Sequence, residues 1–277
     1  MGDTDIERVV VCDLDGVLWR GDAAIPGSAG AVAHLRAEGR RVAFLTNNSS
    51  HRVIDVVNRL GAIGVPASAD DVLSSAQAAA ALLREDLPSG ARVLTCAGPG
   101  VVEALDAAGY QTVDGGRAYD GVVDAVVVGF HREFDFDRLD RAADAVRRGA
   151  RFVATNLDAT YPGTDRVLPG AGSLVAAVST ASGRSPEVAG KPEAATVALV
   201  HARLGHDGVM VGDRPSTDGE LACRLGWPFA MVLSGIGGHD PTEPNPTDPA
   251  PAWVAEDLAG LIEALVRYRG SSPRGLP

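Results

Sequence analysis

Short apolar runs alternate with helix-forming patterns along most of the 277 residues. The run over 9–12 lacks the apolar–polar alternation of a half-exposed strand, which predicts a strand buried on both faces. Helical patterns follow such runs and stop at glycines, as the pattern over 28–38 does at Gly39. This strand–helix alternation predicts an α/β fold with a mainly parallel sheet.

The same patterns give approximate bounds for the remaining elements. A polar, proline-rich loop is expected over 236–251, and the last residues are expected to be frayed. Strands are predicted over 41–45, 92–96, 125–129, 152–155, 208–212 and 229–233, helices over 50–60, 192–204 and 216–225, and a final strand and helix over 253–268.

Two aspartates stand at the end of the first buried run. Asp13 and Asp15 are two residues apart, a spacing that places side chains on the same face of a strand, and the chain turns at Gly16. In open α/β sheets ligands bind beyond the carboxyl ends of the strands, and neighbouring carboxylates there favour a divalent cation. A solvated Asp-x-Asp-Gly turn is the alternative interpretation.

A second polar cluster, Thr46, Asn47, Asn48, Ser49 and Ser50, follows the predicted strand over 41–45. Hydroxyl, amide and backbone N–H groups ahead of a helix are typical of an anion-binding loop. The simpler interpretation is a helix N-cap at Ser49 or Ser50.

Two further signals come late in the chain. Lys191 precedes a predicted helix with Pro192 at its first position, and a lysine there is unfavourable for the helix dipole unless the ammonium binds an anion. A surface lysine is the alternative. Near the end, a buried strand leads into Gly212 and Asp213, and Asp218 follows five residues later.

The four clusters occur in the order Asp-x-Asp, Thr, Lys and Gly-Asp-x-x-x-x-Asp, and this order resembles the haloacid dehalogenase superfamily. The resemblance extends to its NagD-like, p-nitrophenyl phosphatase-like group. It is carried by DLDGVLWRG (13–21), IPG (25–27), TNN (46–48), ATNLDATYPG (154–163), LPGAGSL (168–174), GKPE (190–193) and VGDRPSTD (211–218).

The resemblance implies a Rossmann-like core with an inserted α/β cap domain. The gap from Asn48 to Lys191 is also too long for a single crossover connection, so it independently predicts an inserted domain. The expected bounds are 1–76 for the first part of the core, 77–185 for the cap and 186–277 for the second part of the core.

The resemblance also implies a role for each matching residue. Asp13 is expected to be the nucleophile that forms an aspartyl-phosphate, and Asp15 the general acid and base. Asp13, Asp213 and the backbone carbonyl of Asp15 are expected to bind Mg²⁺. Asp218 would orient Lys191 or a metal-bound water.

The remaining implied roles concern the substrate. Thr46, Asn47, Asn48 and the catalytic Lys191 are expected to hold the phosphoryl group. Asn156 and Asp158 are expected to contact the leaving group, although an Asx-turn explains them equally well. Arg214 would add positive charge, or be solvated.

The implied activity is Mg²⁺-dependent hydrolysis of a small phosphomonoester. Glycerol 3-phosphate or 2-phosphoglycolate is the expected substrate, and a nucleoside monophosphate or pyridoxal phosphate is the alternative. A phosphotransferase and a non-catalytic protein that binds a phosphorylated metabolite are further alternatives. The second aspartate, Asp15, favours an enzyme, because simple binding does not need it.

Charge and cysteine content restrict the partners. The formal net charge of −11 disfavours nucleic acid and anionic membranes as partners. The N-terminal sequence lacks the cationic and apolar regions of a signal peptide, and Cys12, Cys96 and Cys223 show no disulfide or zinc spacing. A cytoplasmic protein is therefore expected. The family resemblance adds a homodimer formed through the cap as an expectation.

Overall fold

The structure is a computed structural model that describes residues 9–162, 166–235 and 248–269. By its internal contacts the chain divides into two compact units. The first comprises Met1–Leu45, Leu60–Asp71 and Leu204–Pro277, and the second comprises Thr46–Arg59 and Val72–Arg203. The boundaries expected from the sequence, 1–76, 77–185 and 186–277, stay a prediction.

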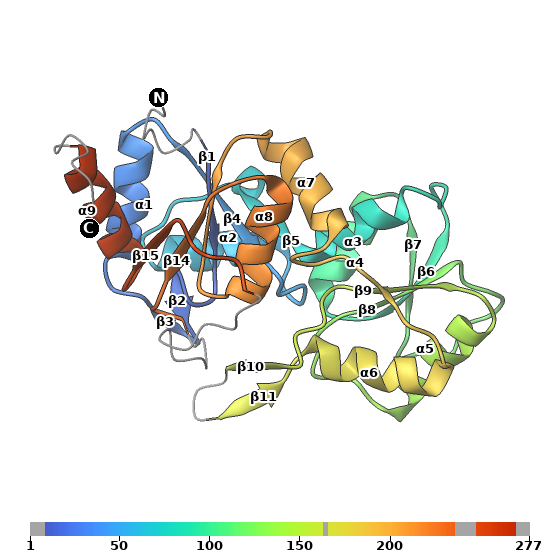
Figure 1. The fold of residues 1–277 in the computed structure, drawn as a ribbon. Helices are drawn as coiled ribbons and strands as arrows, with labels where there is room; N and C mark the ends of the chain where they lie inside the picture. The colour runs from blue at the N-terminus through green and yellow to red at the C-terminus, as the bar shows by residue number, and fades with distance from the viewer. Residues whose placement is uncertain (1–8, 163–165, 236–247, 270–277) are drawn as a thin grey trace. The chain divides into compact units, whose positions relative to one another are not determined.

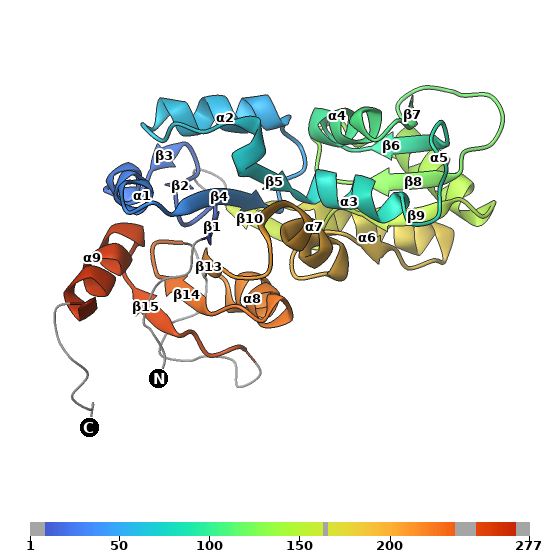
Figure 2. The same ribbon diagram turned by 90° about the horizontal axis from the view of Figure 1, so that it is seen from above.

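The first unit contains parallel strands in the order β15-β14-β13-β1-β4, and Figure 2 shows β13, β14 and β15 following one another. Helices α1 and α9 pack side by side in this unit (Figure 1). Its elements are β1 (Val9–Asp13), the β2–β3 hairpin (Trp19–Arg20 and Ala23–Ala24), α1 (Ser28–Ala37), β4 (Arg41–Thr46), the 3-10 turn η1 (Ala69–Asp71), β13 (Val209–Gly212), the π-helical turn η2 (Pro215–Gly219), α8 (Glu220–Leu225), β14 (Phe229–Val232), β15 (Trp253–Ala255) and α9 (Leu258–Arg269).

The second unit has its own parallel sheet, in the order β12-β9-β8-β6-β7. Helix α2 (Val53–Ala62) contributes residues to both units. The other elements are β5 (Val72–Ser74), α3 (Ser75–Leu83), β6 (Arg92–Cys96), α4 (Pro99–Ala107), β7 (Gln111–Asp114), β8 (Ala125–Val128), α5 (Phe136–Arg147), β9 (Arg151–Ala154), the β10–β11 hairpin (Thr160–Pro162 and Val167–Pro169), α6 (Ala171–Ser182), β12 (Glu187–Val188) and α7 (Ala194–Leu204).

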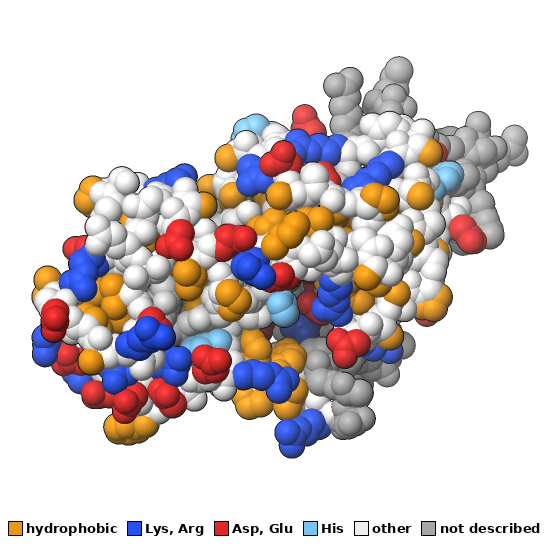
Figure 3. Space-filling model, turned by 180° about the vertical axis from the view of Figure 1, so that it is seen from behind, with side chains coloured by type: hydrophobic (Ala, Val, Ile, Leu, Met, Phe, Trp, Pro, Cys, Tyr) orange, Lys and Arg blue, Asp and Glu red, His pale blue; other side chains and the backbone are white. Residues whose placement is uncertain are grey.

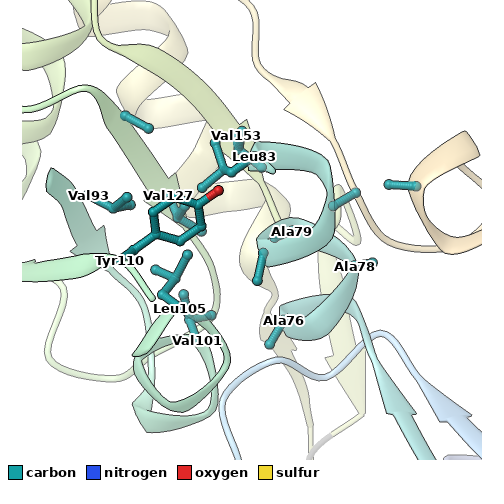
Figure 4. Packing of buried hydrophobic residues seen from close by; sticks show 14 of the residues in the cluster. Ala76, Ala78, Ala79, Leu83, Val93, Val101, Leu105, Tyr110, Val127 and Val153 are labelled. Carbon is teal, nitrogen blue, oxygen red and sulfur yellow. The ribbon is translucent and has the colours of Figure 1, made fainter. Parts of the chain in front are cut away.

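Two apolar clusters cover the two faces of this second sheet. Neighbouring residues of a strand point to opposite faces, so Val93 joins one cluster and Leu94 the other. The first cluster includes residues of α3 and α4, and the second includes residues of α5 and α6. Figure 4 shows Tyr110 within the first cluster, beside Val101 and Leu105.

The outer face of α5 is charged. Arg141 pairs with Asp137 at 3.0 Å, and Arg148 pairs with Asp144 at 2.9 Å, each one helical turn apart. Acidic and basic side chains are interspersed over the face seen in Figure 3. Among the described residues, no helix combines the length and apolar character that a membrane crossing requires.

The α/β fold with mainly parallel sheets is as predicted, but three helix starts differ. Helix α2 begins at Val53, where the Asp55 carboxylate accepts a hydrogen bond from the Arg52 N–H at 3.2 Å. Neither predicted N-cap acts there, because the Ser50 hydroxyl donates to Asn48 and that of Ser49 pairs with Thr155.

The other two differences lie near prolines. Helix α7 begins at Ala194, so Pro192 lies in the preceding turn and not at the first helical position. The predicted helix over 216–225 starts as the π-helical turn η2 and becomes α-helical at Glu220. Most of the predicted loop over 236–251 and the predicted frayed tail lie outside the described residues.

Candidate active site

Asp13 ends a fully buried strand. Its relative exposure is only 8%, and in the parallel pairing of β1 with β4 it lies opposite Leu45. The preceding Cys12 is also buried, and burial raises the pKa of its thiol to about 12. A strand side chain next to Asp13 points to the other face of the sheet, so Cys12 belongs to the core, as the sequence predicts.

Asp15 lies beyond the strand, in the turn that follows it. It is exposed, and the Trp19 indole N–H donates to its Oδ1 at 2.9 Å. The Gly16 N–H donates to the Trp19 carbonyl at 2.7 Å, which closes the turn. Asp13 and Asp15 thus differ in environment: one carboxylate is buried and the other is accessible and oriented by an aromatic side chain.

Asp213 and Asp218 join Asp13 in a buried carboxylate cluster. Strand β13 pairs with β1, so Asp213, directly after β13, lies at the same carboxyl edge as Asp13. Asp218 lies in η2, and its Oδ2 accepts a hydrogen bond from the Arg214 N–H at 3.2 Å. One carboxylate oxygen from each of the three aspartates lies within 4.8 Å of the others.

Glycines allow this close packing of carboxylates. A Cβ at Gly16 would lie 2.5 Å from Asp213 Oδ2, and one at Gly235 would overlap the same carboxylate. A Cβ at Gly212 would overlap the Asp218 carboxylate. Because buried like charges repel, the arrangement favours a divalent cation with oxygen ligands, and the three aspartates fit Mg²⁺.

The second unit holds its own polar cluster around Asn47. The Asn47 Oδ1 accepts from the Lys191 N–H at 2.8 Å, and its Nδ2 donates to the Lys191 carbonyl at 3.2 Å. Its own carbonyl accepts from Asn156 Nδ2 at 2.7 Å and from Ser75 Oγ at 2.7 Å. The amide of Asn47 therefore fixes the backbone of Lys191, whose side chain is buried.

The other predicted substrate-binding residues of this unit lie near Asn47, either in the sequence or through hydrogen bonds. The Thr46 hydroxyl accepts from the Asn48 N–H at 3.0 Å, and Thr46 is buried whereas Asn48 is exposed. Asn156 Oδ1 accepts from the Asp158 N–H at 3.0 Å, so the Asx-turn is formed. Asp158 Oδ2 also accepts from Asn47 Nδ2 at 3.5 Å, so the same loop contacts the polar cluster.

Three supporting residues of these sites were not predicted from the sequence. Ser75, Trp19 and Gly235 each support a predicted site residue through a hydrogen bond or close packing. Arg20, close to Asp15 in sequence, donates from Nε to the Ser234 carbonyl at 3.1 Å. A sequence signal existed for Trp19, which lies within the DLDGVLWRG stretch that carries the family resemblance.

Comparison with known proteins identifies the family of the chain. The family model for haloacid dehalogenase-like hydrolases matches residues 10–111, and a HAD-hydrolase-like model matches residues 188–261. The chain is 37% identical over 254 residues to D-glycerol 3-phosphate phosphatase of Mycobacterium tuberculosis, covering 91% of this chain and 70% of that protein.

Solved structures show the same similarity. The glycerol phosphate phosphatase of Mycobacterium tuberculosis in complex with magnesium superposes with a TM-score of 0.84 at 36% identity, covering 93% of this chain and 77% of that one. The p-nitrophenyl phosphatase of Archaeoglobus fulgidus gives a TM-score of 0.84 at 28% identity, with 94% and 100% covered. The chain therefore belongs to the haloacid dehalogenase-like hydrolases, in their NagD-like, p-nitrophenyl phosphatase-like group.

Proposed function

We propose that this protein is a Mg²⁺-dependent phosphatase that hydrolyses a small phosphomonoester through an aspartyl-phosphate on Asp13. The observation that carries the proposal is the buried cluster of Asp13, Asp213 and Asp218, with the accessible Asp15 two residues after Asp13. The family membership and the phosphatase activities named for the relatives support the same conclusion.

The proposed reaction has two steps. A carboxylate oxygen of Asp13 attacks phosphorus in line, the ester P–O bond breaks, and Asp15 gives its proton to the leaving alkoxide. Asp15 then takes a proton from water, which attacks the phosphorus of the aspartyl-phosphate. The bond between phosphorus and Asp13 breaks, and inorganic phosphate is released. An exposed carboxylate oriented by Trp19 suits this proton transfer in both directions.

Mg²⁺ would be held by Asp13, Asp213 and the Asp15 carbonyl, with Asp218 completing the carboxylate cluster. When bound, it neutralises these charges and stabilises charge on the phosphoryl oxygens. Thr46, Asn48 and Lys191 are proposed to contact the phosphoryl group, and Asn47 to position Lys191. Asn156, Asp158 and Arg214 are proposed to contact the substrate.

Glycerol 3-phosphate is the proposed substrate, ahead of 2-phosphoglycolate. The support is the activity named for the relative from Mycobacterium tuberculosis, and the chain covers most of that protein. A cytoplasmic location and a homodimer formed through the cap stay predictions.

The test is phosphate release from a panel of esters, with Mg²⁺ and with EDTA. The panel contains glycerol 3-phosphate, 2-phosphoglycolate, a nucleoside monophosphate and pyridoxal phosphate. We expect Mg²⁺-dependent release with glycerol 3-phosphate ahead. Another ester well ahead would correct the substrate, and no release from any ester by protein that binds Mg²⁺ would favour the non-catalytic alternative.

A further inference from the structure

Two buried hydroxyl groups join the loop after β4 to the loop after β9. Ser49 Oγ and Thr155 Oγ1 lie 2.9 Å apart, and both residues are fully buried. A buried hydroxyl is costly unless it forms a hydrogen bond, so each of these groups depends on the other. Neither hydroxyl is among the groups proposed to contact the phosphoryl group, so the proposed reaction does not by itself explain the pair.

Glycines leave the space in which these two hydroxyl groups meet. A Cβ at Gly129, directly after β8, would lie 2.7 Å from Ser49 Oγ and 2.9 Å from Thr155 Oγ1. A Cβ at Gly100, on α4, would lie 2.7 Å from the Ser49 carbonyl oxygen. Elements far apart in the sequence are thus shaped around the pair.

A second contact ties the same two loops together. Asn156, the residue after Thr155, donates from Nδ2 to the Asn47 carbonyl at 2.7 Å. The loop after β4 is therefore attached at Asn47 and at Ser49 to two consecutive residues of the other loop. Attachment at two points leaves a loop fewer conformations than attachment at one.

The attached loop holds the backbone of Lys191. Asn47 Oδ1 accepts from the Lys191 N–H at 2.8 Å, and Asn47 Nδ2 donates to the Lys191 carbonyl at 3.2 Å. Thr155 also packs against the residue before Lys191, because a Cβ at Gly190 would overlap the Thr155 carbonyl oxygen. The hydroxyl pair and Lys191 are therefore connected by direct contacts within the second unit.

We propose that Ser49 and Thr155 are positioning residues, whose hydroxyl pair fixes the loop after β4 and, through Asn47, the position of Lys191. This role rests on the proposed function, in which Lys191 contacts the phosphoryl group. A group that stabilises charge developing in the transition state acts on the rate only when it is placed accurately. Loss of the pair should therefore lower kcat more than it changes KM.

Removal of one hydroxyl or of both tests the proposal. Thr155→Val keeps the shape of the side chain, Ser49→Ala removes the other hydroxyl, and the double variant removes both. Each single variant leaves one buried hydroxyl unsatisfied and should lose stability, whereas the double variant should regain part of that stability. We expect kcat to fall about fivefold or more in all three variants, with KM within about twofold of the wild-type value.

Hydrogen exchange gives a measurement that does not depend on hydrolysis. The Lys191 N–H donates to Asn47, so in the same three variants this amide should exchange at least about fivefold faster. Thr95→Val is the control, because it removes another buried hydroxyl of this unit, one that donates to the Val113 carbonyl at 3.2 Å. It should change neither kcat nor the exchange of Lys191. Thr155→Ser keeps the hydroxyl and should resemble the wild type in both measurements.

Two kinds of result would overturn the proposal. Recovery of kcat together with stability in the double variant would mean that the pair acts only on folding. Unchanged exchange of the Lys191 amide in Thr155→Val and in the double variant, or faster exchange with unchanged kcat, would break the connection to Lys191 or to the reaction. Absence of phosphate release by the wild type would contradict the proposed function, and the exchange rates would still decide whether the pair positions Lys191.

Discussion

At the scale of single residues, the carboxylate cluster depends on glycines, which place no side chain beside it. Gly16 has a φ of 90° and faces the Asp213 carboxylate, and Gly235 approaches the same carboxylate from another part of the chain. The DLDG sequence indicates a turn, but the contact with Asp213 joins residues far apart in sequence. The turn could be predicted from the sequence, and its role in packing Asp213 could not.

Gly16→Ala tests this packing. The added Cβ would lie 2.5 Å from Asp213 Oδ2, so we expect displacement of the carboxylate and a roughly tenfold or larger loss of Mg²⁺-dependent activity. Gly21→Ala is a matched control, because Gly21 also has a positive φ, of 54°, and a Cβ there meets no atom of the described residues within 4 Å. An equal loss in both variants would show that backbone strain, and not contact with Asp213, is responsible.

Tyr110 offers a test of stability away from the candidate site. Its hydroxyl is buried in the first apolar cluster of the second unit (Figure 4) and has no hydrogen-bond partner among the residues that the structure describes. Burial also raises the pKa of this hydroxyl. Because an unsatisfied buried hydroxyl costs about 1–3 kcal/mol, Tyr110→Phe should leave the free energy of unfolding unchanged or raise it by about 1 kcal/mol.

Urea denaturation followed by circular dichroism measures this change. Tyr110→Ala, which removes the ring as well, serves as the control and should destabilise by about 3 kcal/mol or more. A clear destabilisation by Tyr110→Phe would mean that the hydroxyl has a partner in solution.

At the scale of elements, the sequence predicts buried strands well and short or exposed ones poorly. Strands β1, β8 and β13 are almost entirely apolar, and the predicted ranges agree with the structure to within one residue. Strand β7 was not predicted, because its pattern of Gln111, Thr112, Val113 and Asp114 is mixed and it lies at the sheet edge. The hairpins β2–β3 and β10–β11 are too short for a periodic pattern.

The loop after β4 shows that the residues of a site are easier to predict from the sequence than the role of each one. Asn47 was expected to contact a phosphoryl group, whereas its amide bonds to the backbone of Lys191, 144 positions away in the chain. Residue types and their order predicted both residues as members of the site, and their roles in it stay predictions. The geometry that links them depends on the folding of everything between them.

Asn47→Ala tests this link. Loss of both hydrogen bonds should let Lys191 move, so we expect kcat to fall about tenfold or more while the protein remains folded. Asn58→Ala is the comparison, since Asn58 is exposed on α2 and lies outside the polar cluster around Asn47. Kinetics of Asn47→Ala, Lys191→Ala and the double variant should show effects that are not additive. Additive losses would mean that Asn47 acts independently of Lys191.

At the scale of the whole molecule, the net charge of −11 and the buried carboxylates both favour a bound cation. Mg²⁺ should therefore raise the melting temperature, and EDTA should lower it, because a ligand that binds the folded state stabilises it. Ca²⁺ should stabilise as well but inhibit turnover, since its larger and looser coordination shell would misplace Asp13.

Differential scanning fluorimetry of the wild type and Asp213→Asn, with a parallel activity assay, separates these effects. The variant should lose most of the stabilisation by Mg²⁺. An equal response to Mg²⁺ in the variant would place the cation elsewhere, and activation by Ca²⁺ would contradict the proposed geometry.

The central claim is that Asp13 is the covalent nucleophile, and the steady-state kcat of Asp13→Asn tests it most directly. The measurement is phosphate release from glycerol 3-phosphate, or the preferred ester, at saturating Mg²⁺. We predict a loss of at least about 10³-fold in kcat, as expected when a nucleophile is removed. Activity above about a tenth of the wild-type value would contradict Asp13 as the nucleophile.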